Sequence, residues 1–296
     1  MVVRHAATVR RWAVLLPFPV VVWFARRNRP WLLATAASAG IVVLGFMGFK
    51  LGPPASDAPA PDARHLRVAC FNMQGGNCNA EALRAWIDRT APDIISFEEP
   101  SAATLDRCLP NDEWHRFEAW DLTVASRHPI AGGAKLDKEG RSNPGAACLV
   151  TVDTPLGVVT AGAVHLSTAR DYLEALVRPT RMLFEVFERN RSLRDERSQA
   201  ISRWMRESES PCDVVLGDFN LPPESAIFKR DWTWRRRAFS EAGAGFGHTW
   251  HSSWHGAAID HVLISKRWSA AACWVGPDLG SDHRPLVADL IEQSAE

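Results

Sequence analysis

The chain has 296 residues, of which 46% are hydrophobic and 23% are charged, and this length and composition indicate a globular protein with one large domain and an appendage. The net charge of zero hides an asymmetry, because residues 1–50 hold seven basic residues and no acid, whereas residues 51–296 hold 27 Lys and Arg against 34 Asp and Glu. A net acidic body argues against tight, non-specific binding of duplex nucleic acid, although a bound divalent cation could still equip it for nuclease chemistry.

The first 50 residues predict a membrane anchor. Residues 12–25 form an apolar run of 14 residues with two prolines, and residues 31–49 form a run of 19 residues without any charge. A helix that spans a bilayer needs about 20 apolar residues, so the second run is predicted to be transmembrane. We therefore expect residues 12–49 to contact membrane lipid.

The basic residues around these runs predict the orientation of the anchor. Arg26, Arg27 and Arg29 precede the second run, and Lys50 is the only base directly after it. Basic clusters stay on the cytoplasmic side, which places the body outside the cytoplasm. The alternative is a hairpin of both runs that returns the body to the cytoplasm with three arginines on the unfavourable side.

Residues 51–64 are predicted to be a linker, because four prolines with Ala, Ser and Asp favour an extended spacer. The folded domain is then expected to cover residues 65–296. All six cysteines lie in this domain without any CxxC spacing, and we favour buried, unpaired cysteines over disulfides.

Periodicity in the body predicts many short strands and few helices. A helix is expected over residues 79–90, with Asn79 as N-cap, and two more over residues 172–189 and 195–207. Strands are expected at residues 66–72, 93–98, 122–126, 147–152, 158–165, 213–216, 259–265, 271–275 and 285–291. This pattern favours two mixed or antiparallel sheets with helices outside over a regular βαβ array.

Polar side chains stand at the ends of these apolar strands. The set comprises Asn72, Glu98, Glu99, His165, Asp218, Asn220, Asp260, Asp282 and His283. The end of one strand and the start of its antiparallel neighbour lie on the same rim of a sheet, so these residues are expected to converge. Asp218 and Asn220, two positions apart, are expected to point to the same side.

The residue types in this set fit phosphoryl transfer. Carboxylates and an Asn oxygen suit a hard cation such as Mg²⁺ or Mn²⁺, and histidines can orient or protonate phosphoryl oxygens. Such a reaction needs positioning and charge neutralisation more than covalent chemistry. Each short motif alone is equally compatible with a turn or a capped loop, so the prediction rests on their joint occurrence.

From about residue 66 to 291 the chain resembles the endonuclease/exonuclease/phosphatase superfamily, which has the DNase I-like fold. The resemblance rests on seven motifs in the family's order: Cys70-Phe71-Asn72, residues 93–99 (DIISFEE), residues 126–130 (SRHPI), Val164-His165-Leu166, Gly217-Asp218-Phe219-Asn220, Ile259-Asp260-His261 and residues 281–286 (SDHRPL). It implies a four-layer α/β/β/α sandwich and hydrolysis of phosphate esters with a divalent metal.

The resemblance also implies roles for single residues. Glu99, Asn72 and Asp282 would bind the metal, with Glu98, which stands where the family often has Gln, as a second choice. Asp218 would position or activate the attacking water. Asn220 would hold the phosphate, His283 would contact it under the orientation of Asp260, and His165 would be a further phosphate ligand or general acid. Arg170 and Arg127 are weaker candidates for substrate binding.

The chain departs from the family pattern at three points. Ser101 occupies a position where some nuclease members have Arg, and the only tyrosine, Tyr172, lies in a different context from the family's site Tyr. The sequence does not show which carboxylate orients His165, and Glu113, Glu118 and Asp121 are the candidates.

We therefore predict a metal-dependent phosphodiesterase whose substrate is a nucleic acid or a lipid head group, and no protein partner. The 13 tryptophans could stack on bases, contact lipid head groups or simply belong to the core. The alternative function is a membrane-tethered binding or scaffold protein that kept the fold without catalysis. The complete set of site residues argues against that alternative.

Overall fold

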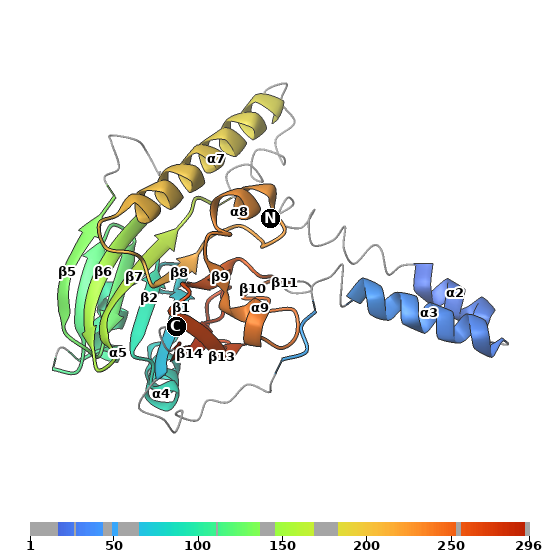
Figure 1. Cartoon of the computed structure of the whole chain (residues 1–296), viewed down its shortest axis with the longest axis horizontal. Helices are drawn as coiled ribbons and strands as arrows, with labels where there is room; N and C mark the ends of the chain where they lie inside the picture. The colour runs from blue at the N-terminus through green and yellow to red at the C-terminus, as the bar shows by residue number, and fades with distance from the viewer. Residues whose placement is uncertain are drawn as a thin grey trace.

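The computed structural model describes residues 17–26, 28–43, 49–52, 65–110, 112–136, 146–168, 183–252 and 256–293. These residues form two six-stranded sheets packed face to face (Figure 1). The first sheet has the order β13 (Trp268–Val275), β14 (Leu286–Glu292), β1 (His65–Asn72), β2 (Ile94–Glu98), β4 (Leu122–Ser126), β3 (His115–Ala119). The second has the order β5 (Ile130–Lys135), β6 (Ala146–Thr154), β7 (Gly157–His165), β8 (Val214–Asp218), β12 (Asp260–Ile264), β9 (Arg236–Arg237).

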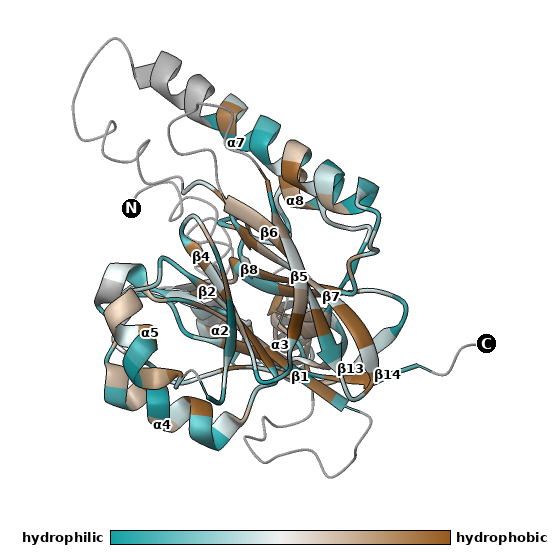
Figure 2. Ribbon diagram, turned by 90° about the vertical axis from the view of Figure 1, so that its left-hand side faces the viewer, coloured by the Kyte–Doolittle hydropathy of each residue, from teal (hydrophilic) through white to brown (hydrophobic). Residues whose placement is uncertain are grey.

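Helices cover the outer face of each sheet. Figure 2 shows α4 (Ala80–Thr90) and α5 (Ala102–Cys108) on one side of the sandwich and α7 (Leu183–Glu207) and α8 (Ala226–Asp231) on the other. Short elements complete the fold: η2 (Gln74–Gly76), α9 (Ala238–Ala242) and the pair β10 (Trp250–His251) and β11 (Gly256–Ala257). The predicted four-layer α/β/β/α architecture is confirmed.

Strand alternation divides the core into three layers. Val68 and Cys70 of β1 belong to the cluster between the sheets, whereas Ala69 and Phe71 face α4 and α5. In β8 the same alternation places Leu216 between the sheets and Val215 against α7 and α8. Because side chains alternate with a period of two, each strand has one row that points into the space between the sheets.

The predicted first helix of the body is confirmed with its cap. The Asn79 side chain accepts hydrogen bonds from the backbone N–H groups of Glu81 and Ala82, both at 3.0 Å. These bonds satisfy two of the free N–H groups at the helix start. Leu83, Trp86 and Ile87 are buried on one face, as the periodicity predicts.

Most predicted strands occur within two residues of their expected bounds, but one helix boundary was wrong. α7 continues from Leu183 to Glu207, through the expected interruption between residues 189 and 195. That interval contains no Gly or Pro, and its polar residues continue an exposed helix face. The expected helical residues 172–182 lie outside the described residues. Sequence periodicity did not predict α5, β3, β5, α8 or α9.

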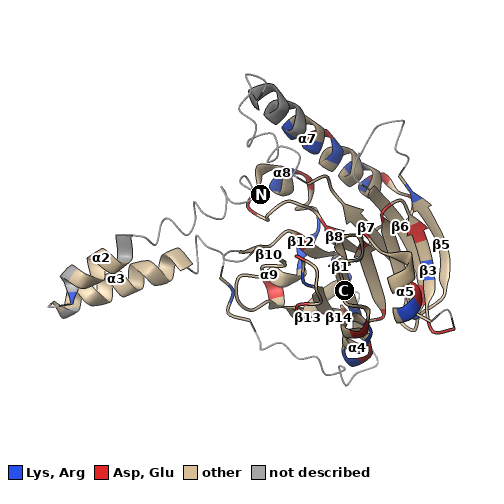
Figure 3. Ribbon diagram, turned by 180° about the vertical axis from the view of Figure 1, so that it is seen from behind, with Lys and Arg blue, Asp and Glu red and all other residues tan. Residues whose placement is uncertain are grey.

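The N-terminal region contains two short helices that lie side by side and project from the body (Figure 1). They are α2 (Pro17–Ala25) and α3 (Arg29–Ile41), and Figure 3 shows no acidic residue on either. Among the residues that the structure describes, no helix combines the length and apolarity needed to cross a bilayer. The predicted transmembrane helix over residues 31–49 is therefore not observed: α3 has 13 residues, and residues 44–48 lie outside the description.

All six cysteines are buried and unpaired, as the sequence favours. Cys70 and Cys148 belong to the cluster between the sheets. Burial raises the pKa of Cys148 to about 12, which keeps it a neutral thiol. These cysteines therefore act as small apolar core residues.

Candidate active site

The candidate site lies where the inward rows of five strands end. Asn72, Glu98, His165 and Asp218 stand at the last positions of β1, β2, β7 and β8, and Asp260 opens the antiparallel strand β12. Each of them continues a row of side chains between the sheets, for example Val214, Leu216 and then Asp218. The register pairs His165 with Asp218 and Asp218 with Asp260. The convergence predicted from the sequence is confirmed.

Asp218 is the centre of this group. Its side chain is 1% exposed, and Oδ1 accepts a hydrogen bond from the backbone N–H of Asn220 at 2.8 Å. Oδ2 accepts from the Nδ2 atoms of Asn72 and Asn220 at 3.0 and 3.1 Å. Nε2 of His283 lies 3.7 Å from Oδ2, and Nε2 of His165 lies 3.9 Å from the same oxygen. One carboxylate oxygen thus stands between two histidines.

Each histidine is held from behind by its own carboxylate. Asp260 accepts from Nδ1 of His283 at 2.9 Å, and Asp121 accepts from Nδ1 of His165 at 2.8 Å. A hydrogen bond at Nδ1 fixes the ring orientation and leaves Nε2 facing the site. Asp121 is therefore the partner of His165 among the three candidates. Glu113 is exposed, and so is Glu118 on β3.

These carboxylates favour the protonated form of both histidines. Burial by itself lowers the pKa of His283, but Asp260 and Asp218 outweigh it and raise the pKa to about 9. For His165 burial also lowers the pKa, but the hydrogen bond that its Nδ1 donates to Asp121, together with the charge of Asp218, raises the pKa above its ordinary value. At neutral pH the His283 ring therefore presents an N–H donor and a positive charge to the site, and the raised pKa of His165 favours the same form of that ring.

Three residues at the site have unusual backbone conformations. Gly217 has φ +131°, and a Cβ there would lie 2.1 Å from the carbonyl oxygen of Val164, so only glycine fits. Glu99 and Asn220 have φ values of 50° and 51°, which is uncommon for residues with side chains. Such conformations concentrate at functional sites, where surrounding contacts hold them.

The loop before β14 brings the last two predicted residues to the same rim. Ser281 donates a hydrogen bond from Oγ to the backbone carbonyl of Asn72 at 2.8 Å, which ties the loop to β1. Asp282 accepts a hydrogen bond from Nε1 of Trp250 at 2.9 Å, and its backbone N–H donates to Oε1 of Gln74 at 3.4 Å. Trp250, Gln74 and Thr168 line or support the site and were missed from the sequence.

The site encloses a small cavity of about 30 Å³, enough for a water molecule or an ion. It is lined by Asn72, Gln74, Glu99, Thr168, Asp218, Asn220, Asp282 and His283. Its donor set is mostly oxygen, and Oδ1 of Asn220 is buried without a hydrogen-bond partner among the described residues. Oxygen ligands and an unsatisfied oxygen fit a hard divalent cation.

The charge balance supports the same fit. Five carboxyl groups gather here against two histidines: Glu99, Asp121, Asp218, Asp260 and Asp282. Oxygens of Asp218 and Asp260 and a ring nitrogen of His283 lie within 4.8 Å of one another. Since Nδ1 of His283 already bonds Asp260, we interpret these three as a proton-handling relay. The cation then fits better on the side of Asn72, Glu99 and Asp282.

Hydrogen bonds within the protein hold the Asn220 side chain. Its Nδ2 donates to the carbonyl of Leu166 at 2.7 Å and to Oδ2 of Asp218 at 3.1 Å, which occupies both amide hydrogens. Arg194 of α7 donates from Nη2 to the Asn220 carbonyl at 2.9 Å and holds this turn. In this arrangement Asn220 orients Asp218 and offers an oxygen to the site.

The two arginines predicted to bind substrate are not part of the described site. Arg127 follows β4 at the end that pairs with Ile94, whereas Glu98 at the other end of β2 forms the rim. Its guanidinium packs over Trp114 at 4.6 Å and donates to the carbonyl of Pro92. The prediction for Arg127 is therefore wrong. Arg170 lies outside the described residues.

Glu98, the second choice for metal binding, is a buried acid with a raised pKa. It is 0% exposed, and Ser96 donates to its Oε1 at 2.5 Å. Burial, and then the charges of Asp260 and Asp218, raise the pKa of Glu98 well above its ordinary value. Its side chain belongs to the inward row of β2, behind the cavity rather than in its lining.

We expect Glu98→Gln to leave turnover within about threefold of the parent and to stabilise the fold at neutral pH. An acid whose pKa is raised on folding loses stability as pH rises above its unfolded pKa, and Gln removes this loss. Thermal melting at pH 7.5 and at pH 4.5 should show a gain that is larger at pH 7.5. Exposed Glu209→Gln is the control, and strong inactivation by Glu98→Gln without stabilisation would contradict the assignment.

The family of the chain follows from comparison with known proteins. Residues 69–283 match the Endonuclease/Exonuclease/phosphatase family. The chain belongs to this family. It is accordingly a hydrolase of the phosphoesterase type. A search of curated proteins finds no match.

Several solved structures share the fold of this chain. D. rerio TDP2 in complex with a single-strand DNA product is 12% identical with a TM-score of 0.58, covering 77% of this chain and 99% of that one. The human Nocturnin catalytic domain with a bound sulfate anion is 15% identical with a TM-score of 0.55, covering 78% and 95%. A family protein from Beutenbergia cavernae is 19% identical with a TM-score of 0.52, covering 78% and 72%.

Proposed function

We propose that this phosphoesterase hydrolyses phosphodiester bonds with the help of Mg²⁺ or Mn²⁺. The observation that carries the proposal is the position of Asp218 between the Nε2 atoms of His165 and His283, each ring backed by its own carboxylate. This arrangement provides a proton acceptor and two cationic donors around one point. A phosphoryl group needs this combination for attack by water.

The charge of each residue indicates its role in the proposed reaction. Asp218, a carboxylate, can orient a water molecule and take its proton. His283, whose pKa of about 9 makes its ring a cation at neutral pH, and His165, whose raised pKa favours the cation, donate hydrogen bonds to phosphoryl oxygens or to the leaving oxygen. Glu99, Asn72 and Asp282 would hold the cation, which supplies neutralisation of the phosphoryl charge when bound.

The proposed substrate class is a phosphodiester of a nucleic acid or a lipid head group. The single-strand DNA product in D. rerio TDP2 and the sulfate in human Nocturnin support a site that accepts phosphate-like groups in this family. The acidic body disfavours duplex DNA, and the apolar N-terminal helices favour a substrate at a membrane. Among the tryptophans, Trp232 is buried in the core, and Trp250 supports Asp282.

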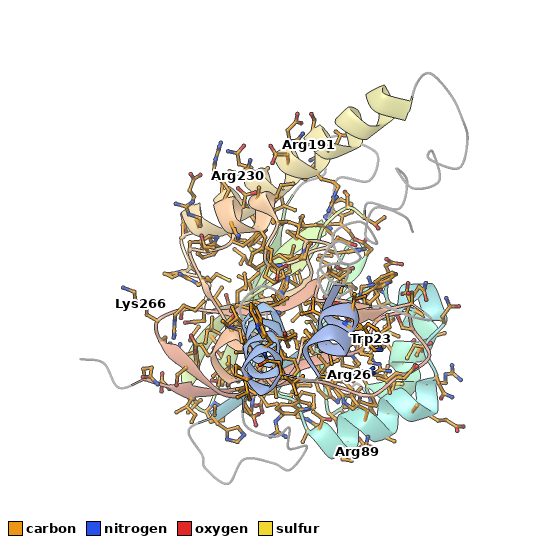
Figure 4. The ribbon with its side chains drawn as sticks, turned by 90° about the vertical axis from the view of Figure 1, so that its right-hand side faces the viewer. Trp23, Arg26, Arg89, Arg191, Arg230 and Lys266 are labelled. Carbon is orange, nitrogen blue, oxygen red and sulfur yellow. The ribbon has the colours of Figure 1, made fainter. Side chains whose placement is uncertain are left out.

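We also propose that residues 12–49 attach the protein to a membrane and that the catalytic domain lies outside the cytoplasm. α2 and α3 leave large apolar side chains exposed, including Trp23 at 55% and Leu33 at 70%. The Arg26 guanidinium lies 4.8 Å from the Trp23 ring, near the turn between the helices (Figure 4). Aromatic and basic residues together favour the interface between lipid and water.

A substrate panel tests the proposed chemistry. The full chain in detergent micelles is incubated with plasmid DNA, single-stranded DNA, RNA, sphingomyelin and bis-p-nitrophenyl phosphate, in Mg²⁺, Mn²⁺ or EDTA. We expect cleavage of at least one diester that EDTA abolishes. If no compound is cleaved under any metal condition, the scaffold alternative replaces the enzyme.

Membrane attachment has its own tests. Cell fractionation should place the full chain with membranes, and a chain lacking residues 1–50 should become extractable in buffer. Alkaline phosphatase fused after Glu296 should be active, because alkaline phosphatase folds only outside the cytoplasm. Green fluorescent protein fused at the same position should be dark, because it does not become fluorescent after export. The opposite pattern would reverse the proposed orientation.

A further inference from the structure

A second cavity of about 330 Å³ lies behind one wall of the active site. That wall consists of two extended segments around the bridge between Trp250 and His283. They are joined by hydrogen bonds from the N–H of His251 to the carbonyl of Asp282 at 2.8 Å and from the N–H of Arg284 to the carbonyl of Thr249 at 2.7 Å.

Adjacent residues of the wall line different cavities. His283 lines the catalytic cavity, whereas Arg284 and His251 line the second. Neighbouring side chains in extended chain point to opposite sides, which explains the separation. A volume of 330 Å³ falls in the range of small-ligand sites, roughly 300–1,000 Å³.

The lining combines unsatisfied polar groups with aromatic walls. Within the part of the chain that the structure describes, the Arg284 guanidinium makes no ion pair, and Nδ1 of His251 is buried without a hydrogen-bond partner. Phe246 stacks on His248 with ring centroids 5.3 Å apart, and Trp274 forms another side. A planar cation fits an oxyanion such as a phosphoryl group, and Nδ1 of His251 adds a donor in the tautomer that carries the ring proton there. The aromatic rings fit a less polar attachment.

The N-terminal segment docks on the loop that forms this cavity. Lys50 and Gly245 exchange two backbone hydrogen bonds of 2.8 Å, and the Phe49 ring lies edge-on to Phe246 at 4.9 Å. A Cβ on Gly52 would lie 2.2 Å from the carbonyl oxygen of Gly243, so the close approach requires glycine. The docked segment begins eight residues after the end of α3 at Ile41, which brings the cavity close to the apolar helices.

We propose that this cavity binds the phosphoryl head group of an anionic membrane lipid. Arg284 and His251 hold the phosphoryl oxygens, and the aromatic rings contact the glycerol part. The docked residues 49–52 keep the cavity mouth beside the bilayer that α2 and α3 contact. The proposal goes beyond hydrolysis, since the lipid is bound here and not cleaved.

The test measures binding in the absence of turnover. The full chain in uncharged detergent micelles with EDTA is titrated with dihexanoyl phosphatidic acid in a calorimeter. Without a cation the catalytic cavity, lined by Glu99, Asp218 and Asp282, repels phosphate, so binding reports the second cavity. Inorganic phosphate and dihexanoyl phosphatidylcholine are titrated in parallel to separate the lipid source from free phosphate and from a zwitterionic head group.

We expect one phosphatidic acid per chain, with binding weakened at least tenfold by Arg284→Gln and by His251→Phe. The second variant keeps an aromatic ring and removes only the nitrogens, so it remains informative if the first lowers the melting temperature. Lys266→Gln removes an exposed positive charge elsewhere (Figure 4) and should bind like the parent. The Asp218→Asn chain should also bind like the parent, so this result does not depend on the proposed metal-dependent hydrolysis.

Three results would overturn the proposal. Unchanged binding by His251→Phe would exclude the polar lining as the binding site. Equal affinity for inorganic phosphate would reduce the cavity to a free-phosphate site. Stronger binding by Asp218→Asn would place the ligand in the catalytic cavity, because that substitution removes a charge that repels phosphate there.

Discussion

Asp218→Asn should reduce turnover of a cleavable diester by about 10³-fold or more. The substitution removes the negative charge that positions and deprotonates water, and groups in this role contribute typically 10²–10⁴-fold. It also places an amide where Asp218 accepts three hydrogen bonds from Asn72 and Asn220. Donors then face donors, which costs about 1–3 kcal/mol of stability.

The loss of activity must be separated from the loss of stability. Circular dichroism and thermal melting establish which fraction is folded at the assay temperature, and kcat and KM are measured for that fraction. Asp153→Asn on β6 is the matched control, because Asp153 is exposed and distant from the rim. A folded Asp218→Asn protein with near-parental kcat would exclude Asp218 as the acceptor of the water proton.

The rows of side chains that point into the space between the two sheets explain which site residues could be predicted from the sequence. Strand ends identified Asn72, His165, Asp218 and Asp260, because each continues an apolar row whose period is visible in the sequence. The same period separates Glu98 from Glu99. Glu98 continues the buried row of β2, while Glu99 leaves the strand with φ 50° and reaches the cavity.

Other parts of the site depend on strand register or on loop conformation, and neither can be read from the sequence. Asp121 could not be chosen over Glu113 and Glu118, because the choice depends on the β3–β4 turn next to Trp120, which has φ 63°. Trp250 lies on a strand of two residues, too short for any periodicity. Arg127 belongs to a family motif, but the motif lies at the far end of the sheet.

The helix over 183–207 and the N-terminal region show a second limit. Sequence patterns favoured two helices and a long apolar span, and the structure has one continuous helix and two short ones. Propensity alone does not fix where a helix stops without Gly, Pro or a cap. The proposed membrane attachment therefore rests on the exposed apolar side chains of α2 and α3 and on the docking of residues 49–52.

Asp260→Asn should move the alkaline limit of activity toward neutral pH. In the parent, His283 is active as a cation, and its pKa of about 9 depends on Asp260 and Asp218. A raised histidine pKa means that the active form is complete at low pH and is lost as pH rises through the folded pKa. A bound cation opposes protonation, so the parent limit should lie at or somewhat below pH 9.

Removing the Asp260 charge lowers the pKa of His283, and burial then favours the neutral ring. We expect the alkaline limb of the kcat profile to shift by about three units, so that kcat at pH 8 falls by about 10²-fold, with less loss near pH 6. Asp260→Glu should restore part of the activity at alkaline pH, because it restores the negative charge although the longer side chain changes the geometry. Exposed Asp112→Asn is the control. A uniform loss at every pH would instead mean that Asp260 only supports the fold, and that His283 does not act as the cationic donor.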